Sequence, residues 1–366
     1  MFSYIIRRIL LMVPTLFGIM VINFVVIQFA PGGPVEKVIA QFQGLDSDVT
    51  ARISRSSGSE TSQMQSMGGS ESQSRYRGAQ GLDPALIKEI EKQFGFDQPA
   101  HERFFKMIKE YVCLDFGKSY YRDEKVIDLI ISKLPVSISL GFWTILITYL
   151  VSIPLGIRKA VKDGTKFDIW TSGLIILGNT IPNFLFAVLL IVLFAGGSYW
   201  QIFPLRGIVS DNWAELGLGA KILDYFWHMT LPILSMIIGS FAVMTMMTKN
   251  FFLDEIHKLY VMTARMKGLT EKRVLYGHVF RNAMLIIIAG FPAAFIAILF
   301  TGNMLIEVIF SLDGLGLLGF EAVMNRDYPI VFATLFITVI MGLILRIVSD
   351  ITYTIVDPRI DFEKRG

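Results

Sequence analysis

Two short motifs in the chain have the residue types that hold phosphate groups. Residues 117–119 read Gly-Lys-Ser, the ending of a phosphate-binding loop, but that loop needs a glycine five residues before its second glycine, and position 112 is Val. Residues 314–319 read G-x-G-x-x-G, a dinucleotide-binding pattern, but no strand precedes them and no βαβ unit surrounds them. We therefore predict no nucleotide site in this chain.

The remaining reactive side chains do not form a catalytic or metal pattern. There is no H-E-x-x-H or G-x-S-x-G motif, and the four histidines are scattered at positions 101, 228, 257 and 278. A single cysteine, Cys113, excludes an internal disulfide and a cysteine metal cluster. We expect neither an enzyme nor a chain that binds a cofactor or metal, and we assign no catalytic residue.

The composition indicates a polytopic membrane protein. Hydrophobic residues make up 53% of the 366 residues and charged residues only 18%, and the mean hydropathy is +0.55. The net charge of +3 is too small to suggest a nucleic-acid partner.

Apolar length predicts six membrane spans. Residues 9–29 follow Arg7 and Arg8 and are longer than the core of a signal peptide, so we interpret them as a retained first span. Five further spans are predicted at residues 136–157, 170–195, 229–248, 284–306 and 330–351. The predicted fold is all-α, with residues 1–366 forming a single transmembrane domain.

Residues 31–134 form a long polar excursion between the first two spans. Residues 47–81 within it are rich in Ser, Gly and Gln and should be disordered, because they cannot bury enough apolar surface to offset chain entropy. Residues 83–133 regain a helical pattern.

Positive charges predict the orientation. The connections at residues 158–167 and 250–283 are rich in Lys and Arg, whereas the short connections on the other side are poorer. We therefore place both termini and the 250–283 loop in the cytoplasm and the long excursion outside, in the periplasm.

The 250–283 loop contains a polar, basic island at residues 260–282. The pattern predicts a helix over 254–266, a turn at Gly268, and a second helix with Thr270 as its N-cap. The second helix should place Val274, Leu275, His278 and Val279 on one side. The alternative is a solvated basic loop that only obeys the charge rule.

This island resembles the cytoplasmic coupling loop, or EAA loop, of permease subunits in the dipeptide, oligopeptide and nickel branch of ATP-binding-cassette (ABC) importers. The matching residues are Thr263, Ala264, Arg265, Lys267, Gly268 and Leu269. Met266 replaces a small residue of the family pattern, and the Glu of the founding motif is absent. In that family the short helix before the glycine sits in a groove of a separate ATPase subunit and transmits its closure.

Other segments carry the same resemblance. They are the Arg-Arg pair at the N-terminus, Pro14, the Ala-Pro-Gly-Gly-Pro at 30–34, Asp-Gln-Pro at 97–99, Asp-Phe-Gly-Lys-Ser at 115–119, Arg-Asp-Tyr-Pro at 326–329 and Asp-Pro-Arg at 357–359. The long outer insert is most similar to that of oligopeptide importers that also take up peptide-nucleotide antibiotics such as microcin C.

The resemblance implies a set of partners. They are a second six-helix permease subunit in a heterodimer, separate or fused ATPase subunits that use ATP and Mg²⁺, a periplasmic substrate-binding protein, and a peptide or peptide-like substrate. It also implies a bacterial inner membrane as the location.

Some residues within or near the spans are candidates for the pathway. Asn179 and Asn183 flank Pro182. We expect them either to line the pathway or to join helices by hydrogen bonds. By resemblance, the outer loop dips toward the mouth of the pathway, which makes Phe310, Leu312 and Leu315 candidate gate residues; the alternative is a loop packed on the partner subunit. Arg346 and Asp350 lie four residues apart and are expected to pair or snorkel as a structural feature.

Two alternative functions stay open. A secondary transporter or channel without an ATPase would need inverted repeats and an ionisable site in mid-membrane, and the sequence shows neither. Within the family, the substrate could be nickel or a dipeptide.

Overall fold

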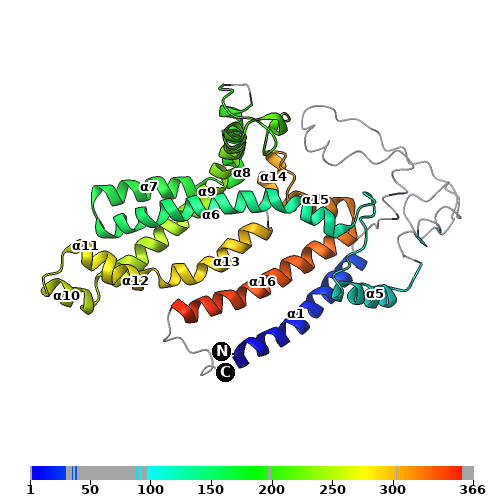
Figure 1. The fold of residues 1–366 in the computed structure, drawn as a ribbon, viewed down its shortest axis with the longest axis horizontal. Coiled ribbons are helices and arrows are strands. Elements are labelled where there is room, and N and C mark those ends of the chain that lie inside the picture. Colours follow the sequence, from blue (N-terminus) through cyan, green and yellow to red (C-terminus); the bar gives the residue numbers. More distant parts are fainter. Residues whose placement is uncertain are drawn as a thin grey trace, which may run out of the picture. The chain divides into compact units, whose positions relative to one another are not determined.

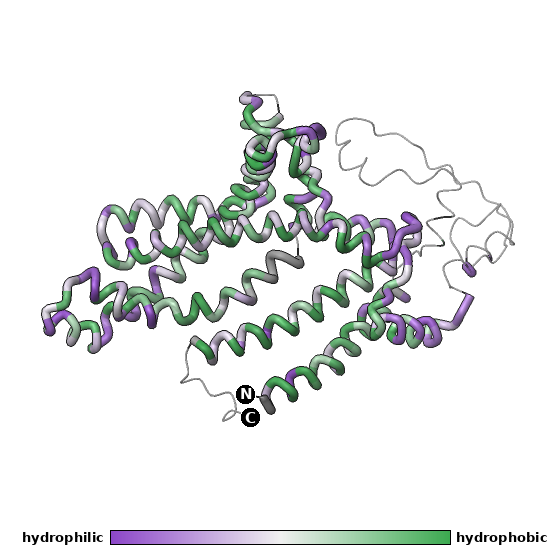
Figure 2. Tube along the Cα trace, viewed as in Figure 1, coloured by the Kyte–Doolittle hydropathy of each residue, from purple (hydrophilic) through white to green (hydrophobic). Residues whose placement is uncertain are grey.

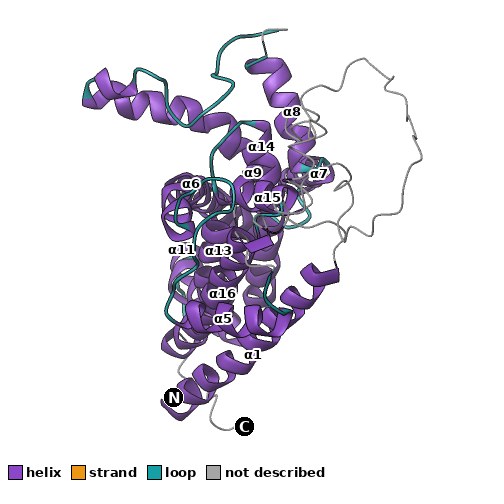
Figure 3. Cartoon of the chain, turned by 90° about the vertical axis from the view of Figure 1, so that its right-hand side faces the viewer, coloured by secondary structure: helices purple, strands orange, loops and turns teal. Residues whose placement is uncertain are grey.

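The structure, a computed structural model, describes residues 2–29, 97–196, 199–301 and 303–356 and the isolated positions 35, 38, 88, 91 and 92. Within these residues the chain is helical and contains no strand (Figure 3); an isolated antiparallel bridge joins Lys118 and Lys125. The Ser/Gly/Gln-rich segment at 47–81 and the motifs at 30–34 and 357–359 lie outside the described residues.

The chain divides into two compact units. Unit 1 consists of Met1–Pro14, Ile131–Leu318 and Ile337–Gly366, and unit 2 consists of Thr15–Ile130 and Gly319–Phe336. The expected single domain and the bounds of its outer excursion stay a prediction.

The structure contains helices that are long and apolar enough to cross a membrane, which agrees with the expected all-α membrane fold (Figures 1 and 2). Four of them do so alone: α1 (Phe2–Phe29), α6 (Val126–Val161), α9 (Leu218–Ile256) and α16 (Tyr328–Val356). Two bent pairs raise the number to six, if each pair is one span.

The first bent pair corrects the expectation of one continuous span over 170–195. Helix α7 (Lys166–Thr180) ends before Ile181, and α8 (Asn183–Phe194) starts at a bend of 92°. Pro182 explains the break, because the residue before a proline is pushed out of the α region, and Ile181 is extended at φ −83° and ψ 119°.

Several helices extend beyond the apolar stretches that predict them. Helix α6 starts ten residues before the expected position 136, and α9 continues from the expected position 248 to Ile256. Hydropathy finds the part that fits the hydrocarbon core, whereas backbone hydrogen bonds continue into polar flanks.

In unit 1, α6 packs closely along α9. Thr148 hydrogen-bonds Ser240 at 3.2 Å, and Ser152 donates to the carbonyl oxygen of Phe241 at 3.3 Å. A Cβ atom built on Gly156 would lie 2.6 Å from the Cβ of Thr248, so the approach requires glycine on α6.

A buried ionic network joins the ends of α6, α7 and α9. The Lys159 side chain is fully buried, and its Nζ lies 2.9 Å from Asp168 Oδ1 and donates to Thr171 and Ser172. Lys249 of α9 reaches the other Asp168 oxygen at 2.7 Å. Two cations around one carboxylate, with hydroxyl partners, meet the requirement that buried charges be paired.

Arg346 and Asp350 were expected to pair or to snorkel, and the pairing is wrong. Asp350 instead forms an ion pair with Arg8 of α1 and accepts a hydrogen bond from Tyr4 at 3.0 Å, while Arg346 is exposed. The four-residue spacing permits a pair on one helix, but a neighbouring helix supplies a better partner.

In unit 2, the loop after α5 (Ala100–Val112) is fastened to the start of α16. Asp327 accepts hydrogen bonds from the Ser119 hydroxyl and from the backbone N–H of Tyr120 and Ile330. Burial raises the pKa of Asp327 above its ordinary value, and these hydrogen bonds oppose the rise. The segments 115–119 and 326–329, which share the family resemblance, thus meet in space.

We expect Asp327→Ala to loosen this loop by about 1–3 kcal/mol, because it removes a helix cap and leaves buried donors unpaired. The purified protein should melt at a lower temperature, and protease should cut residues 113–125 faster. Asp123→Asn is the control, since Asp123 pairs with Lys118 in the same loop but is exposed. Equal effects of the two changes would contradict the role of Asp327.

Candidate functional site

The basic island forms a helix, a tight turn and a second helix, as the sequence predicts (Figure 1). The expected helix over 254–266 is wrong in one respect, because α9 ends at Ile256 and α10 (Leu259–Met266) is separate. Lys258 between them has extended backbone, at φ −73° and ψ 150°, and precedes α10 as its N-cap.

The second helix differs from the expectation in its interior. Helix α11 (Glu271–Val274) continues through the π-helical turn η2 (Leu275–Val279) into α12 (Phe280–Ala283). Val274 and Val279 are buried, but His278 is exposed. A π-helical turn pairs a residue with the one five positions on, which brings Val279 to the side of Val274. Thr270 is the N-cap residue, although its side chain makes no capping hydrogen bond.

Gly268 ends α10 in a Schellman motif. Its N–H donates to the Arg265 carbonyl oxygen at 2.9 Å, and the Leu269 N–H donates to the Ala264 carbonyl oxygen at 3.4 Å. The φ of Gly268 is +80°, a conformation that disfavours side chains, although no atom lies within 4 Å of where a Cβ would be. Backbone conformation, rather than crowding within this chain, requires the glycine.

An ion pair closes the turn between the two helices. Arg265 donates two hydrogen bonds to the Glu271 carboxylate, from Nε at 2.9 Å and from a terminal nitrogen at 3.1 Å. Both side chains are exposed, so the pair adds little stability but favours one orientation of α11 relative to α10.

One face of α10 is buried against the long helices of unit 1. Val261 and Ala264 join a cluster that includes Ile157 and Ala160 of α6 and Phe252 of α9. Removing these apolar side chains from water contributes about 1.5–3 kcal/mol for a residue such as Val261. The contact holds α10 as a rigid extension of the membrane helices.

The opposite face of α10 exposes large apolar side chains. Leu259, Met262 and Met266 are 81%, 58% and 74% exposed, and their spacing of three and four residues places them on one side. In Figure 2 the loop that holds α10 alternates between hydrophilic and hydrophobic stretches. An exposed apolar stripe of this kind marks an interaction surface.

The residues expected to couple to a partner are divided between these two faces. Ala264 is buried and Leu269 is half-buried, whereas Thr263, Arg265, Lys267 and Gly268 are exposed. The sequence reasoning missed Leu259 and Met262, although apolar residues at helical spacing in a polar loop were a signal for them. The coupling role of all these residues stays a prediction.

The two asparagines expected near the pathway occupy different surroundings. Asn179 is exposed on α7. Asn183, at the start of α8, is half-buried against α9, and its Oδ1 lies 2.7 Å from the position a Cβ would take on Gly239. Their role in a pathway stays a prediction.

The outer-loop candidates lie in the core of unit 1. Phe310 and Leu312 are 1% exposed and pack with residues of α6, α8, α9 and α14 (Met304–Ile309). Leu315 begins α15 (Leu315–Asn325) and is half-buried. In this structure Phe310 and Leu312 fill the core, and their role as gate residues stays a prediction.

A buried carboxylate explains two glycines of the G-x-G-x-x-G segment, Gly314 and Gly316. Glu307 is fully buried and accepts hydrogen bonds from the Leu317 N–H at 2.8 Å and the Ser137 hydroxyl at 3.3 Å. A Cβ on Gly314 would lie 2.6 Å from the Glu307 carboxyl carbon, and one on Gly316 would lie 2.8 Å from the Met304 nitrogen. The glycines make room for Glu307 at the start of α15, so the motif serves packing.

Gly316→Ala should destabilise this loop by about 1–3 kcal/mol, because the added methyl group meets backbone that cannot move freely. Gly319→Ala, three residues later in the same helix, is the control, since no atom lies within 4 Å of its Cβ position. We expect the first variant alone to lose monodisperse protein on mild heating in detergent. Equal recovery of both variants would rule out the crowding around Glu307.

Comparison with known proteins gives consistent matches over the whole chain. Residues 152–362 match the family described as "Binding-protein-dependent transport system inner membrane component". The chain is 61% identical to a "Peptidoglycan transport system permease protein YejB" of Agrobacterium fabrum, with 99% of each chain covered. It is 58% identical to an "Inner membrane ABC transporter permease protein YejB" of Escherichia coli O157:H7, over 99% of this chain and 100% of the relative.

More distant matches follow. The chain is 29% identical to an "Oligopeptide transport system permease protein AppB" of Bacillus subtilis, over 99% of this chain and 100% of that protein. A solved inward-facing structure of the MetNI methionine ABC transporter is 14% identical, with a TM-score of 0.48, over 63% of this chain and 97% of that one.

The family implies, in general, an ATPase, a substrate-binding protein and a second permease as partners, and a location in the membrane. The family match covers more than half of the chain, and the first two relatives match it nearly end to end. The chain therefore belongs to the binding-protein-dependent transport system inner membrane components, as the permease subunit of an ABC importer.

Proposed function

We propose that this chain is a permease subunit of a peptide importer and that α10 is the element on which the ATPase docks. The observation that carries the proposal is the division of α10 into two faces. One face is buried against α6 and α9, and the other exposes Leu259, Met262 and Met266.

This division suits the transmission of force. A docking helix must be apolar toward its partner and fixed toward the membrane helices, because a loose helix would absorb the motion of the ATPase. The buried contact of Val261 and Ala264 and the Schellman turn at Gly268 supply the fixed side. The paired cations around Asp168 join the ends of α6, α7 and α9, so these helices would move together.

The partners proposed for the complex follow from this arrangement. ATP and Mg²⁺ are used by the ATPase, as separate or fused subunits, and this chain pairs with a second permease of the same kind. A periplasmic binding protein delivers the substrate to the outer side. Asn179, Asn183, Phe310, Leu312 and Leu315 remain our proposed pathway or gate residues, the buried Phe310 and Leu312 becoming accessible only if the core around them opens.

The proposed substrate is a peptide. The names of the relatives refer to peptidoglycan and to oligopeptides, and peptide is the chemistry that the two have in common. Peptides released from peptidoglycan are therefore the first class to test, by competition uptake with peptides of graded length in a deletion strain.

The proposed topology places both termini and α10 in the cytoplasm and α5 outside, and Cys113 offers a direct test. Cys113 is exposed just after α5, so an impermeant maleimide should label it in cells whose inner membrane is intact. Thr270→Cys in a Cys113→Ser background should react only after the inner membrane is opened. The reverse pattern would contradict the orientation and the direction of transport.

The experiment that tests the coupling role compares two substitutions at Gly268. Gly268→Leu places a side chain at φ +80°, at a local cost of about 1–2 kcal/mol, which is enough to misplace α10 but not to unfold the spans. Gly268→Asn is the matched control, because asparagine tolerates this conformation better than other side chains. We expect Gly268→Leu to abolish uptake at normal membrane abundance, with the ATPase lost on purification or no longer stimulated by substrate.

Normal uptake by Gly268→Leu would show that the 250–283 loop is only a basic connection.

Purification separates the proposal from a secondary transporter or channel. In mild detergent, the proposed permease subunit should bring down an ATPase and a second permease, whereas a self-sufficient transporter should be isolated alone.

A further inference from the structure

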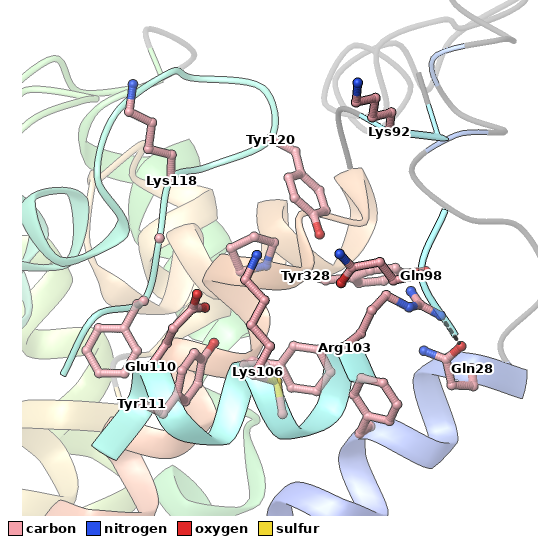
Figure 4. Close-up of a pocket in the computed structure, with 16 residues that line it drawn as sticks. Gln28, Lys92, Gln98, Arg103, Lys106, Glu110, Tyr111, Lys118, Tyr120 and Tyr328 are labelled. Carbon is pink, nitrogen blue, oxygen red and sulfur yellow. Dashed lines mark hydrogen bonds between the residues drawn. The ribbon is translucent and has the colours of Figure 1, made fainter. Parts of the chain in front are cut away.

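A basic cavity of about 360 Å³ lies in unit 2, beside α5 and the ends of α1 and α16 (Figure 4). Its aromatic lining includes Tyr111, Phe116, Tyr120 and Tyr328. Figure 4 shows Arg103 and Lys106 extending from α5, with the Arg103 guanidinium directed toward Gln28. The proposed function gives no role to this cavity.

The charge of the cavity favours an anion. Its lining contains the cations Lys92, Arg103, Lys106 and Lys118 and one carboxylate, Glu110. Lys118 forms an ion pair with Asp123 at 2.9 Å, and the three other cations outnumber the single carboxylate of the lining. Arg103 is oriented by a hydrogen bond from its guanidinium to Gln28 at 3.0 Å.

A second cavity, of about 370 Å³, adjoins the first and is apolar. It shares Phe24 and Gln28 with the basic cavity and is otherwise lined by Val21, Val25, Ala100, His101 and Phe104. The ring of Phe24 lies between two helices. It stacks on the ring of Phe332 of α16, with 6.1 Å between the ring centroids, and meets Phe104 of α5 edge-on, with 5.2 Å between the centroids. A basic compartment thus continues into an apolar one along a membrane-spanning helix.

Helix α5 itself has the character of a helix that lies in the membrane interface. Phe105 and Val112 are 65% and 78% exposed, although the helix also carries Arg103, Lys106 and Lys109. Short helices with exposed apolar groups and basic residues bind at the boundary between headgroups and acyl chains.

We propose that these two cavities form a binding site for one anionic phospholipid. The phosphate occupies the basic cavity beside Arg103 and Lys106, and an acyl chain runs along α1 in the apolar cavity. Charge complementarity and the continuity of the two compartments carry the assignment. A small anion would fill only the first compartment, and a neutral lipid would carry no net charge complementary to the excess of cations in the lining.

The test measures lipid binding to the intact complex by native mass spectrometry, with phosphatidylglycerol, phosphatidylethanolamine and inorganic phosphate as probes. We expect phosphatidylglycerol to bind more tightly than the other two. Lys106→Gln should weaken its binding about fivefold and Lys106→Glu about 25-fold, the effect of removing or reversing one charge near a headgroup. The matched control is Lys109→Gln, which removes the same charge from α5 outside the cavity and should change binding less than twofold.

A second variant tests the acyl compartment without altering charge. Val25→Trp fills the apolar cavity and should weaken phosphatidylglycerol binding while leaving Lys106 in place. Equal losses for Lys106→Gln and Lys109→Gln would overturn the proposal, as would retention of full binding by Val25→Trp. Displacement of the lipid by an acidic peptide, with no preference for phosphatidylglycerol over phosphatidylethanolamine, would assign the cavity to a peptide carboxylate instead.

Discussion

The burial of Val261 and Ala264 against α6 and α9 is the contact on which the proposed function depends. It converts a short helix, which would be unstable alone in water, into a rigid part of the membrane domain. Because one face is fixed in this way, the opposite face can expose Leu259, Met262 and Met266 in a defined position. A loop with the same charge but without this contact could bind a partner yet transmit no motion.

The same loop shows how backbone chemistry sets the positions of side chains. Gly268 takes a positive φ that lets α10 stop after two turns, and Pro182 forces a bend of 92° between α7 and α8. At residues 314 and 316, in contrast, glycine is needed for space around the Glu307 carboxylate. Glycine therefore has two separate physical uses here, and only the first could be inferred from a turn pattern.

Much of the fold could be predicted from the sequence because membranes impose simple rules. Apolar length located four helices that could cross a membrane alone and two bent pairs, and Gly268 located the turn of the 250–283 loop. The errors arose where partners come from distant segments. Asp350 pairs with Arg8 rather than with Arg346. The contact of Ser119 with Asp327, across more than two hundred residues, was not predicted either.

Of the candidate site, the sequence located the loop but not its two faces. The spacing around Thr263 favours a helix, yet it does not say which side packs on α6 and α9. Likewise, Phe310 and Leu312 were chosen for their place in an outer loop, whereas the structure buries both in the core of unit 1. The π-helical turn at Leu275–Val279 has no residue signature that we recognise in the sequence.

Site-specific photocrosslinking tests the central claim most directly. A photoreactive amino acid is placed at Met262, on the exposed face of α10, or at Leu223, another exposed apolar residue, near the opposite end of α9. The account predicts that Met262 crosslinks to a chain whose peptides, by mass spectrometry, include a phosphate-binding loop, while Leu223 does not. Crosslinking of that chain from Leu223, or its absence from Met262 in an assembled complex, would contradict the account.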